Sequence, residues 1–465
     1  FGVAAIMAGT IVFSSTQKNQ DDRSAQSMTE AGLTAGVTQA LNVNNMESVD
    51  VTAGVSDVLM DTTDVDVTDT GLNAVAAAME DTTTDTAENV SVNFLSDYEN
   101  CRNKNYVNLD FSNCSARLPE LNTCSSLNVT VANSSGVPHN ENLENFKKYC
   151  EFFFGEYNSS NALFSSFSKN IVYNQNEDDG KHAWYPKIDN YLEQIQNGNI
   201  DILSFLYRDT DNNKYLWWLR SDDFPHWMNK GEAYSLIKTD DTKVSSWIPS
   251  DMNNKVASYF NDGTHNDETY RILDGNVSIG EAVTYFEKDY LSSLPCDFDS
   301  NYSIYVSTID VYNIHDDIYC YVFKFSTAWN NIPFDRRDEA YTNQAQDASL
   351  QHMVSGEALM IKKNDIDAFV DLSFPNISEI EKPIENICTL ENAVDIMSNT
   401  LTKGVKFELQ TIEFVYMGNY SDDYTTAHLE PSWKFVTHNP NDDLYYCVYV
   451  NAASEECSYI SYKPF

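Results

Sequence analysis

A pattern that occurs twice in the C-terminal half constrains the fold more than any other feature of this 465-residue sequence. The stretches are SIGEAVTYFEKDYL from Ser278 and TLENAVDIMSNTL from Thr389. Each starts with a residue that caps helices; Glu281 completes a capping box in the first, whereas Asn392 leaves the second with its cap alone. The apolar residues then coincide on one face of an amphipathic helix. They are Ile279, Ala282, Val283, Phe286 and Tyr290 in the first copy, and Leu390, Ala393, Val394, Met397 and Leu401 in the second.

Similar alternating segments follow each predicted helix. VSTIDVYNI (306–314) parallels LQTIEFVYM (409–417), and VFKFS (322–326) parallels SWKFV (432–436). Alternation of this kind predicts half-buried strands. In this alignment Trp433 takes the place of Phe323, which favours a core position for Trp433. The sequence therefore predicts two copies of a helix followed by antiparallel strands, over residues 276–375 and 376–465.

Residues 91–275 differ in composition from the segments before them and are rich in aromatic residues. Alternation predicts strands within 106–119 and 126–136, and the apolar stripe Leu143, Phe146, Cys150 and Phe153 predicts a helix over 139–157. The turn residues DTDNN predict a hairpin over 202–220. The predicted fold class is α+β, with antiparallel sheets that are each packed by a helix, two tandem repeats and a preceding α+β domain.

The N-terminal segments predict export. Residues 1–13, FGVAAIMAGTIVF, are too short to span a bilayer, and we interpret residues 1–20 as a signal-peptide or anchor remnant that leaves a possible membrane tether. Residues 21–90 are an acidic, low-complexity stalk. The formal net charge of -41 disfavours nucleic acid as a partner. We expect an extracellular or cell-surface protein, secreted or membrane-tethered.

The repeated segments resemble a known family. Their order of motifs is similar to that of PepSY-type modules and of YycI/YycH-type regulators on the outside of Gram-positive bacteria. The motifs are a [ST]-[LI]-x-x-A-V helix, a T-I-E strand, P-S-W-K-F and Y-V-N-A-x-S-x-E. In such modules the last motif usually ends in Thr-Gly-Glu, whereas this chain has Ser454-Glu455-Glu456. The resemblance implies a module without catalytic residues of its own, which inhibits or assists secreted peptidases or binds the outer part of a sensor kinase. It transfers no site residue.

Sequence motifs for catalysis or metal binding are missing. The chain has no HExxH, GxSxG, GxxxxGK[ST] or GxGxxG pattern, and the histidines near 265 and 315 fall in polar, turn-like stretches. We therefore predict no catalytic residue, metal or cofactor. A hydrolase whose site is assembled from scattered carboxylates is an alternative of a different class.

A cluster of aromatic residues makes the strongest case for binding. Five tryptophans fall within 64 residues, and exposed tryptophans stack on sugar rings or anchor protein partners. Because adjacent strand residues face opposite sides, at most one of Trp217 and Trp218 points to the core. The predicted function is non-catalytic binding and regulation of an extracellular protein, a peptidase or sensor receptor; the alternative is a polysaccharide- or surface-binding adhesin that uses residues 184–247. The partner-binding candidates are Trp184, Trp217, Trp218, Trp227 and Trp247.

The last predicted strands carry a candidate disulfide. Residues 431–460 read as three strands and two turns. A three-residue loop at 451–453 would place Cys447 directly opposite Cys457, so a cross-strand disulfide is possible if the turn fixes that register.

Overall fold

A computed structural model describes most of the chain after residue 93, with gaps. The described residues are 94–119, 121, 123–130, 139–166, 184–186, 188–197, 202–209, 211–219, 225–232, 254–295, 298–335, 355–372, 374–420 and 426–462. The predicted signal or anchor segment and the predicted stalk lie outside them, as does Trp247. Within the described ranges, no helix has both the length and the apolar character that crossing a membrane requires.

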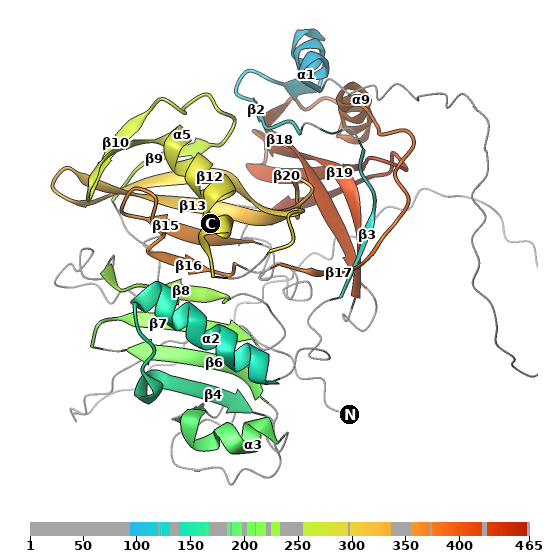
Figure 1. Cartoon of the computed structure of the whole chain (residues 1–465). Coiled ribbons are helices and arrows are strands. Elements are labelled where there is room, and N and C mark those ends of the chain that lie inside the picture. Colours follow the sequence, from blue (N-terminus) through green and yellow to red (C-terminus); the bar gives the residue numbers. More distant parts are fainter. Residues whose placement is uncertain are drawn as a thin grey trace, which may run out of the picture. The chain divides into compact units, whose positions relative to one another are not determined.

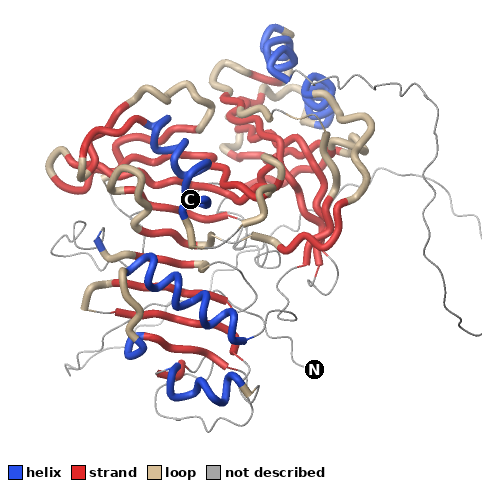
Figure 2. The backbone as a smooth tube through the Cα atoms, in the orientation of Figure 1, coloured by secondary structure: helices blue, strands red, loops and turns tan. Residues whose placement is uncertain are grey.

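Strands dominate the described residues and form two large sheets, as the red segments of Figure 2 show. The large sheet has eleven strands and the C-terminal sheet has eight, and β10 (Thr269–Ile272) and β11 (Gly275–Ser278) form a separate pair. The described part of the chain is mixed α+β, with antiparallel pairing throughout the large sheet, as predicted.

The large sheet runs from β5 to β9. Its order is β5 (Trp184–Pro186), β4 (Ala162–Ser166), β6 (Ile202–Asp209), β7 (Lys214–Leu219), β8 (Trp227–Asn229), β16 (Ala368–Val370), β15 (Ser355–Met360), β13 (Ile318–Trp329), β12 (Tyr302–His315) and β9 (Lys255–Phe260), with β14 (Ile332–Pro333) beside β13.

The C-terminal sheet is built around two long strands. Its main path is β1 (Leu109–Asp110), β18 (Phe407–Tyr420), β19 (Thr426–Asn439), β20 (Leu444–Asn451) and β21 (Cys457–Tyr462). Three further strands join it, namely β2 (Ser115–Ala116) beside β18, β3 (Leu127–Thr130) beside β19, and β17 (Asn376–Ile380) beside β3.

The helices are short and lie against the sheets. They are α1 (Phe94–Asn103), α2 (His139–Phe154), α3 (Leu192–Gln196), α5 (Ile279–Thr284), α6 (Tyr290–Ser293) and α9 (Leu390–Thr400), with 3₁₀ turns η1 (Ser159–Asn161) and η2 (Ile188–Tyr191) and a π-helix, η4 (Tyr285–Asp289). Figure 1 shows α2 over β6 and β7, and the α5 segment over β12 and β13. The predicted helix stripe Leu143, Phe146, Cys150 and Phe153 is buried, so that prediction is confirmed.

The two predicted helix-and-strand copies are both present. In the first, the α5–η4–α6 segment precedes β12, β13, β15 and β16; in the second, α9 precedes β18, β19, β20 and β21, and each set of strands pairs antiparallel in that order. The Ser278 capping box forms, and the Thr389 hydroxyl accepts from the Asn392 amide, as predicted. A β-bulge occurs at Ser307 in β12 and at Gln410 in β18, which are equivalent positions.

The second strands of the two copies are offset by two residues relative to the predicted alignment. Ile309 faces Phe323 across its hairpin, whereas the equivalent Ile412 faces Phe435. Trp433 is therefore equivalent in register to Tyr321, and its predicted match with Phe323 was wrong. A shift of two residues keeps a side chain on the same face of a sheet. Trp433 is accordingly buried, as predicted.

Residues 91–275, predicted as one domain, contribute strands to both sheets. The segments β1, β2 and β3 pair with β18, β19 and β17 of the C-terminal sheet. The strands from β4 to β8 instead continue the large sheet, because β8 pairs with β16. The described residues belong to a single compact unit.

The last turn of the chain takes a shape that favours glycine. Asn451 closes it with its side chain, which accepts from the amides of Ala453 and Ser454. Glu455 has a φ of 61°, in the left-handed region that residues other than glycine rarely adopt. It stands where the resembled modules carry glycine, so the turn keeps a glycine-like conformation without the glycine.

Candidate functional site

The three predicted tryptophans whose side chains the structure describes, Trp217, Trp218 and Trp227, do not share one environment. Trp218 is fully buried, edge-on to Tyr149 at a centroid distance of 5.3 Å. Trp217 points to the opposite face, as predicted for adjacent strand residues, and is half-buried. Trp184 begins β5, where it pairs with Ser165. Trp247 lies outside the described residues.

Trp217 and Trp227 form the one pair of predicted tryptophans that the described residues bring together. Their rings are 5.1 Å apart in an edge-to-face arrangement, and both side chains are half-buried. The Trp227 indole N–H donates to Asp371 Oδ1 at 2.9 Å, and Asp371 has a φ of 55°. The Trp217 indole N–H is buried and makes no hydrogen bond to any residue that the structure describes. The pair offers a partly exposed aromatic surface beside one carboxylate.

A second set of residues comes from the repeat itself. Asp310 and Glu413 occupy the same position after the equivalent bulges of β12 and β18, and both are buried. Asp310 faces Val322 and Glu413 faces Lys434 across their hairpins. Neighbouring residues on these strands face the helices, so both acids lie on the helix-free face of their sheet. A buried carboxyl needs partners, because an unpaired charge in the interior is costly.

Asp310 has its partners within its own sheet. Its carboxylate accepts from Ser258 Oγ at 2.5 Å and from Lys255 Nζ at 2.9 Å, and Lys324 Nζ lies 3.6 Å away. Both lysines are partly exposed, whereas the Asp310 side chain is almost completely buried. The charge of this acid is therefore well compensated.

Glu413 has a different environment. Lys434, directly opposite, makes its ion pair with Asp335 instead, at 2.8 Å, and Asp335 also accepts from the Tyr449 hydroxyl at 2.9 Å. Glu413 accepts a longer hydrogen bond, of 3.2 Å, from Tyr305 of β12. Burial raises the pKa of Glu413; nearby Asp335 also raises it, while Lys434 and Arg117 only partly offset the rise.

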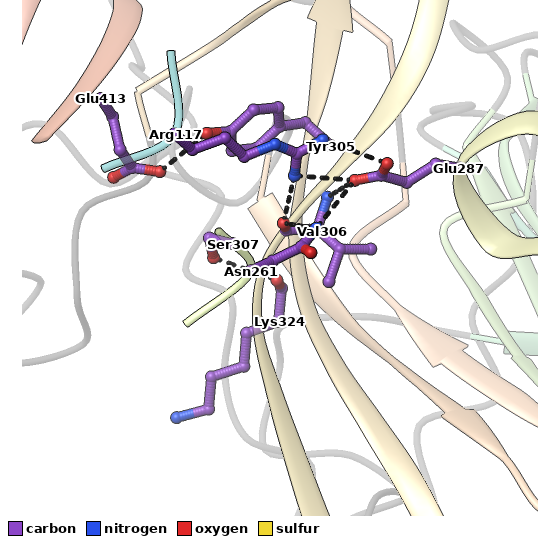
Figure 3. Close-up of polar contacts among 8 residues, drawn as sticks. All are labelled: Arg117, Asn261, Glu287, Tyr305, Val306, Ser307, Lys324 and Glu413. Atoms are coloured by element: carbon purple, nitrogen blue, oxygen red, sulfur yellow. Dashed lines mark hydrogen bonds and ion pairs between the residues drawn. The ribbon is translucent and has the colours of Figure 1, made fainter. Parts of the chain in front are cut away.

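Arg117, just after β2, joins the two sheets at this point (Figure 3). Its guanidinium makes a bidentate pair with Glu287 at 2.9 and 3.1 Å and donates to the Val306 carbonyl at 2.6 Å. It also stacks 3.9 Å above the Tyr305 ring, while its backbone N–H donates to Ile412. Glu287 lies in the π-helix η4 and accepts from the Val306 amide at 2.7 Å. We call this set the inter-sheet network; it comprises Arg117, Glu287, Tyr305, Asp335, Glu413, Lys434 and Tyr449.

Sequence reasoning missed this network. The one signal in the sequence is that Thr-Ile-Asp and Thr-Ile-Glu recur at matching positions, which marks Asp310 and Glu413. Arg117, Glu287 and Asp335 belong to unrelated segments, and only tertiary contacts bring them to Glu413.

The predicted Cys447–Cys457 disulfide is contradicted by the register. Cys447 faces Ile460, and Cys457 faces Val450. Cys447 and Val450 are three residues apart, so the two cysteine side chains lie on opposite faces of the sheet. The loop is longer than the predicted three residues, since Asn451 still hydrogen-bonds to Glu456. That extra length changed the register and made the pairing prediction wrong.

The polar stretch around His265 is a turn, as predicted, and His315 ends β12 just before the turn at Asp316 and Asp317. His265 Nδ1 lies 2.7 Å from Glu268 Oε1 in an exposed turn, and His315 lies beside Asp316. No cluster of three or more metal-ligating side chains occurs among the residues that the structure describes.

Comparisons with known proteins give one distant structural neighbour. No family model and no curated protein matches the chain. Among solved structures, the chain is similar to the Bacillus megaterium YpeB C-terminal domain, at 11% sequence identity and a TM-score of 0.27. The match covers 70% of this chain and 99% of that domain. No residue is carried over from a likeness of this degree.

Proposed function

We propose that this chain is an extracytoplasmic, non-catalytic protein that binds and regulates another extracellular protein, and that its two helix-and-strand units are PepSY-like repeats. The repeated helix, the coincident bulges and the glycine-like conformation of Glu455 support the assignment of the repeats. Location at the cell surface, secreted or tethered, is part of the proposal and rests on the N-terminal sequence.

The observation that carries the proposal is an exposed sheet edge. Among the described strands, β21 pairs with β20 alone. Its Ser458 and Tyr459 side chains are exposed, and Tyr459 retains 44% of its accessible surface. A free edge of this kind accepts an extended segment of a partner as an additional strand, through main-chain hydrogen bonds. Residues 457–462 contain neither lysine nor proline, the residues that usually protect an edge.

The buried acids support a structural interpretation of the carboxylates. Asp310 is held by Ser258 and Lys255, and Glu413 accepts from Tyr305. Groups engaged in this way stabilise a scaffold, so the hydrolase with scattered carboxylates is the weaker alternative.

The test is cross-linking of the full chain at the surface of its native cells. Tyr459→Lys places a charge on the β21 edge, and Leu95→Lys makes the same kind of change on α1, where Leu95 is 61% exposed. We expect a cross-linked protein partner that Tyr459→Lys loses and Leu95→Lys retains. Absence of any protein partner would refute the proposal, and retention by Tyr459→Lys would exclude the β21 edge.

Polysaccharide binding is a second candidate function, favoured by the Trp217–Trp227 pair beside Asp371. Aromatic faces next to a carboxylate suit the stacking and hydrogen bonding of a sugar ring. The full chain should then be retained on cell-wall polysaccharide, and Trp227→Ala should abolish retention while the circular dichroism spectrum stays unchanged. Equal retention of both proteins would exclude this pair as the binding surface.

A further inference from the structure

The strands from β4 to β8 form a third helix-and-strand unit of the kind that the two copies show. The helix α2 precedes β4, β6, β7 and β8, which pair antiparallel in that order, with β5 and α3 inserted after β4. The first copy has the same arrangement, with the α5–η4–α6 segment before β12, β13, β15 and β16. Both helical segments pack in one core cluster, so they cover the same face of the large sheet (Figure 1).

These two units are joined through the last of their paired strands. β8 pairs antiparallel with β16, and Met228 faces Phe369 across the junction. Both side chains are fully buried, and the Phe369 ring lies 6.1 Å from the Phe153 ring of α2 and 6.5 Å from the Tyr290 ring of α6. Antiparallel pairing of equivalent strands is the arrangement that a two-fold axis produces. The junction therefore shows how the last strand of one such unit binds the last strand of another.

Tyr459 of β21 holds the position of Phe369 in the second copy. Cross-strand register connects one row of four residues in each copy. The rows are Ile309, Phe323, Ala358 and Phe369 in the first copy, and Ile412, Phe435, Val448 and Tyr459 in the second. Phe369 is fully buried, whereas Tyr459 keeps 44% of its accessible surface. Among the described strands, the second copy lacks the one that covers this position in the first.

The main-chain groups at Tyr459 point to the free edge of β21. The Asn451 N–H donates to the Glu456 carbonyl, which makes these two residues a hydrogen-bonded pair next to the β20–β21 ladder. Such pairs alternate along antiparallel strands, so the next residues of β21 to bond with β20 are Ser458 and Ile460. The residues that direct their N–H and C=O groups away from β20 are Cys457, Tyr459 and Ser461.

Phe369 has the same orientation in the first copy. The Lys230 N–H donates to the Asp367 carbonyl, so Met228 and Phe369, two residues further along, form a hydrogen-bonded pair between β8 and β16. The edge of β21 therefore presents at Tyr459 the main-chain groups with which β16 holds β8 at Phe369.

We propose that β21 pairs antiparallel with β21 of a second copy of this chain, about a two-fold axis that sets Tyr459 opposite Tyr459 of the second copy. This pairing repeats between two copies the junction that β8 and β16 make within one. It indicates an identical strand as the occupant, because the strand on the equivalent edge is the last strand of a unit of the same kind. Residues 457–462 carry no charged side chain, so no like charges meet within the pairing.

Such a dimer goes beyond the proposed function, with which it shares only the β21 edge. Around the axis, Cys457 of one copy faces Ser461 of the other, and these residues exchange main-chain hydrogen bonds in the same way as the two Tyr459 residues do. An extracellular partner that adds a strand at this edge then competes with the second copy.

The experiment is sedimentation equilibrium of the purified full chain, with reductant present so that no disulfide joins two copies. We expect the wild type to form a dimer. Tyr459→Lys should be a monomer, because two like charges would face each other at the axis. Leu95→Lys, which changes an exposed residue of α1, should form the dimer as the wild type does. A wild type that stays monomeric up to about 0.1 mM, or a dimer that Tyr459→Lys retains, would overturn the proposal.

A mixing experiment tests the two-fold register itself. Tyr459→Glu should also be a monomer on its own, whereas an equimolar mixture of Tyr459→Lys and Tyr459→Glu should form a dimer, because opposite charges then face each other. Mixing would not restore association if the substitutions had only damaged the strand. A mixture that stays monomeric would therefore overturn the proposed pairing.

Ser461→Pro gives a second measure that does not depend on charge. It removes an N–H that points away from β20, so the hairpin keeps its own hydrogen bonds while the free edge loses a donor. This variant should associate more weakly than the wild type and keep its circular dichroism spectrum; undiminished association would overturn the proposal.

The dimer and the proposed function fail in different experiments. A monomeric wild type in pure solution would overturn the dimer and leave the search for an extracellular partner unaffected. Native cells that yield no other protein would refute the proposed function, while a dimer of the pure chain would still stand.

Discussion

Asp310 and Glu413 hold the same position in two successive helix-and-strand units, yet two lysines surround Asp310 while the lysine opposite Glu413 pairs with Asp335. The same sequence motif thus serves two purposes. In the first copy the acid links β12 to β9 within one sheet, because it accepts hydrogen bonds from Lys255 and Ser258 of β9. In the second copy it faces the other sheet, where Tyr305 is its hydrogen-bond donor.

Loss of the buried Lys434 side chain should destabilise the fold strongly. Lys434→Met removes the ammonium group that pairs with Asp335 at 2.8 Å and lies opposite Glu413 in the neighbouring strand. Breaking a buried pair on one side typically costs about 3–5 kcal/mol, and we expect a loss of that size in the free energy of unfolding measured with urea.

The matched control for this change is Lys406→Met. Lys406 makes an ion pair with Asp110 at 3.1 Å, but its side chain is 58% exposed. Exposed pairs contribute about 0–1 kcal/mol, so this variant should be close to the wild type. Similar losses for both variants would mean that the buried Lys434–Asp335 pair contributes no more to the free energy of unfolding than an exposed pair does.

The two repeat helices are capped in different ways, and the difference should appear as coupling between two residues of the first cap. Ser278 and Glu281 form a reciprocal capping box, whereas Thr389 only accepts from the Asn392 amide. Ser278→Ala and Thr389→Ala should each lower the free energy of unfolding by about 1 kcal/mol. In the double variant, Glu281→Ala should lower the free energy of unfolding by less than it does as a single change. The reason is that the two hydrogen bonds belong to one motif. Strict additivity in thermal unfolding would argue against a coupled capping box.

The turn at Glu455 should be relieved by glycine. A residue other than glycine destabilises the fold by roughly 1–2 kcal/mol when its backbone is left-handed. Glycine avoids this strain, but part of the gain is offset because glycine loses more conformational entropy on folding. Both Glu455→Gly and Glu455→Ala lose the bond that Glu455 accepts from Asn392, so their comparison isolates the backbone. We expect Glu455→Gly to melt at a higher temperature than Glu455→Ala. The reverse order would show that the turn changes shape when the side chain is shortened.

His438 should make the C-terminal sheet more stable in mild acid. Its pKa is raised, chiefly by the hydrogen bond to Glu408 at 3.0 Å and also by Asp443 at 3.2 Å, against a smaller lowering by burial. A raised histidine pKa contributes stability that is complete below its unfolded pKa and is lost as the pH rises through the folded pKa. His438→Gln should therefore lower the melting temperature in mild acid and leave it nearly unchanged in alkali. A deficit that is the same at both ends of the range would point to packing against Tyr445 instead.

Local pattern alone was enough for several elements. Helix periodicity and caps located the α2, α5 and α9 segments, and alternation located the long strands β12, β18 and β19. The opposite facing of Trp217 and Trp218 also followed from sequence, because the side chains of a strand alternate wherever the strand lies. These features depend on residues that are close together in the chain.

Tertiary structure decided what local pattern leaves open. The loop after Asn451 set the register that separates Cys447 from Cys457, and an offset of two residues placed Trp433 level with Tyr321. The network around Glu413 needed Arg117 and Glu287, which are 170 residues apart in the chain. A sequence determines which side chains are more stable when buried, because that depends on their own chemistry. It does not by itself determine which distant charges meet, because that depends on how whole sheets pack.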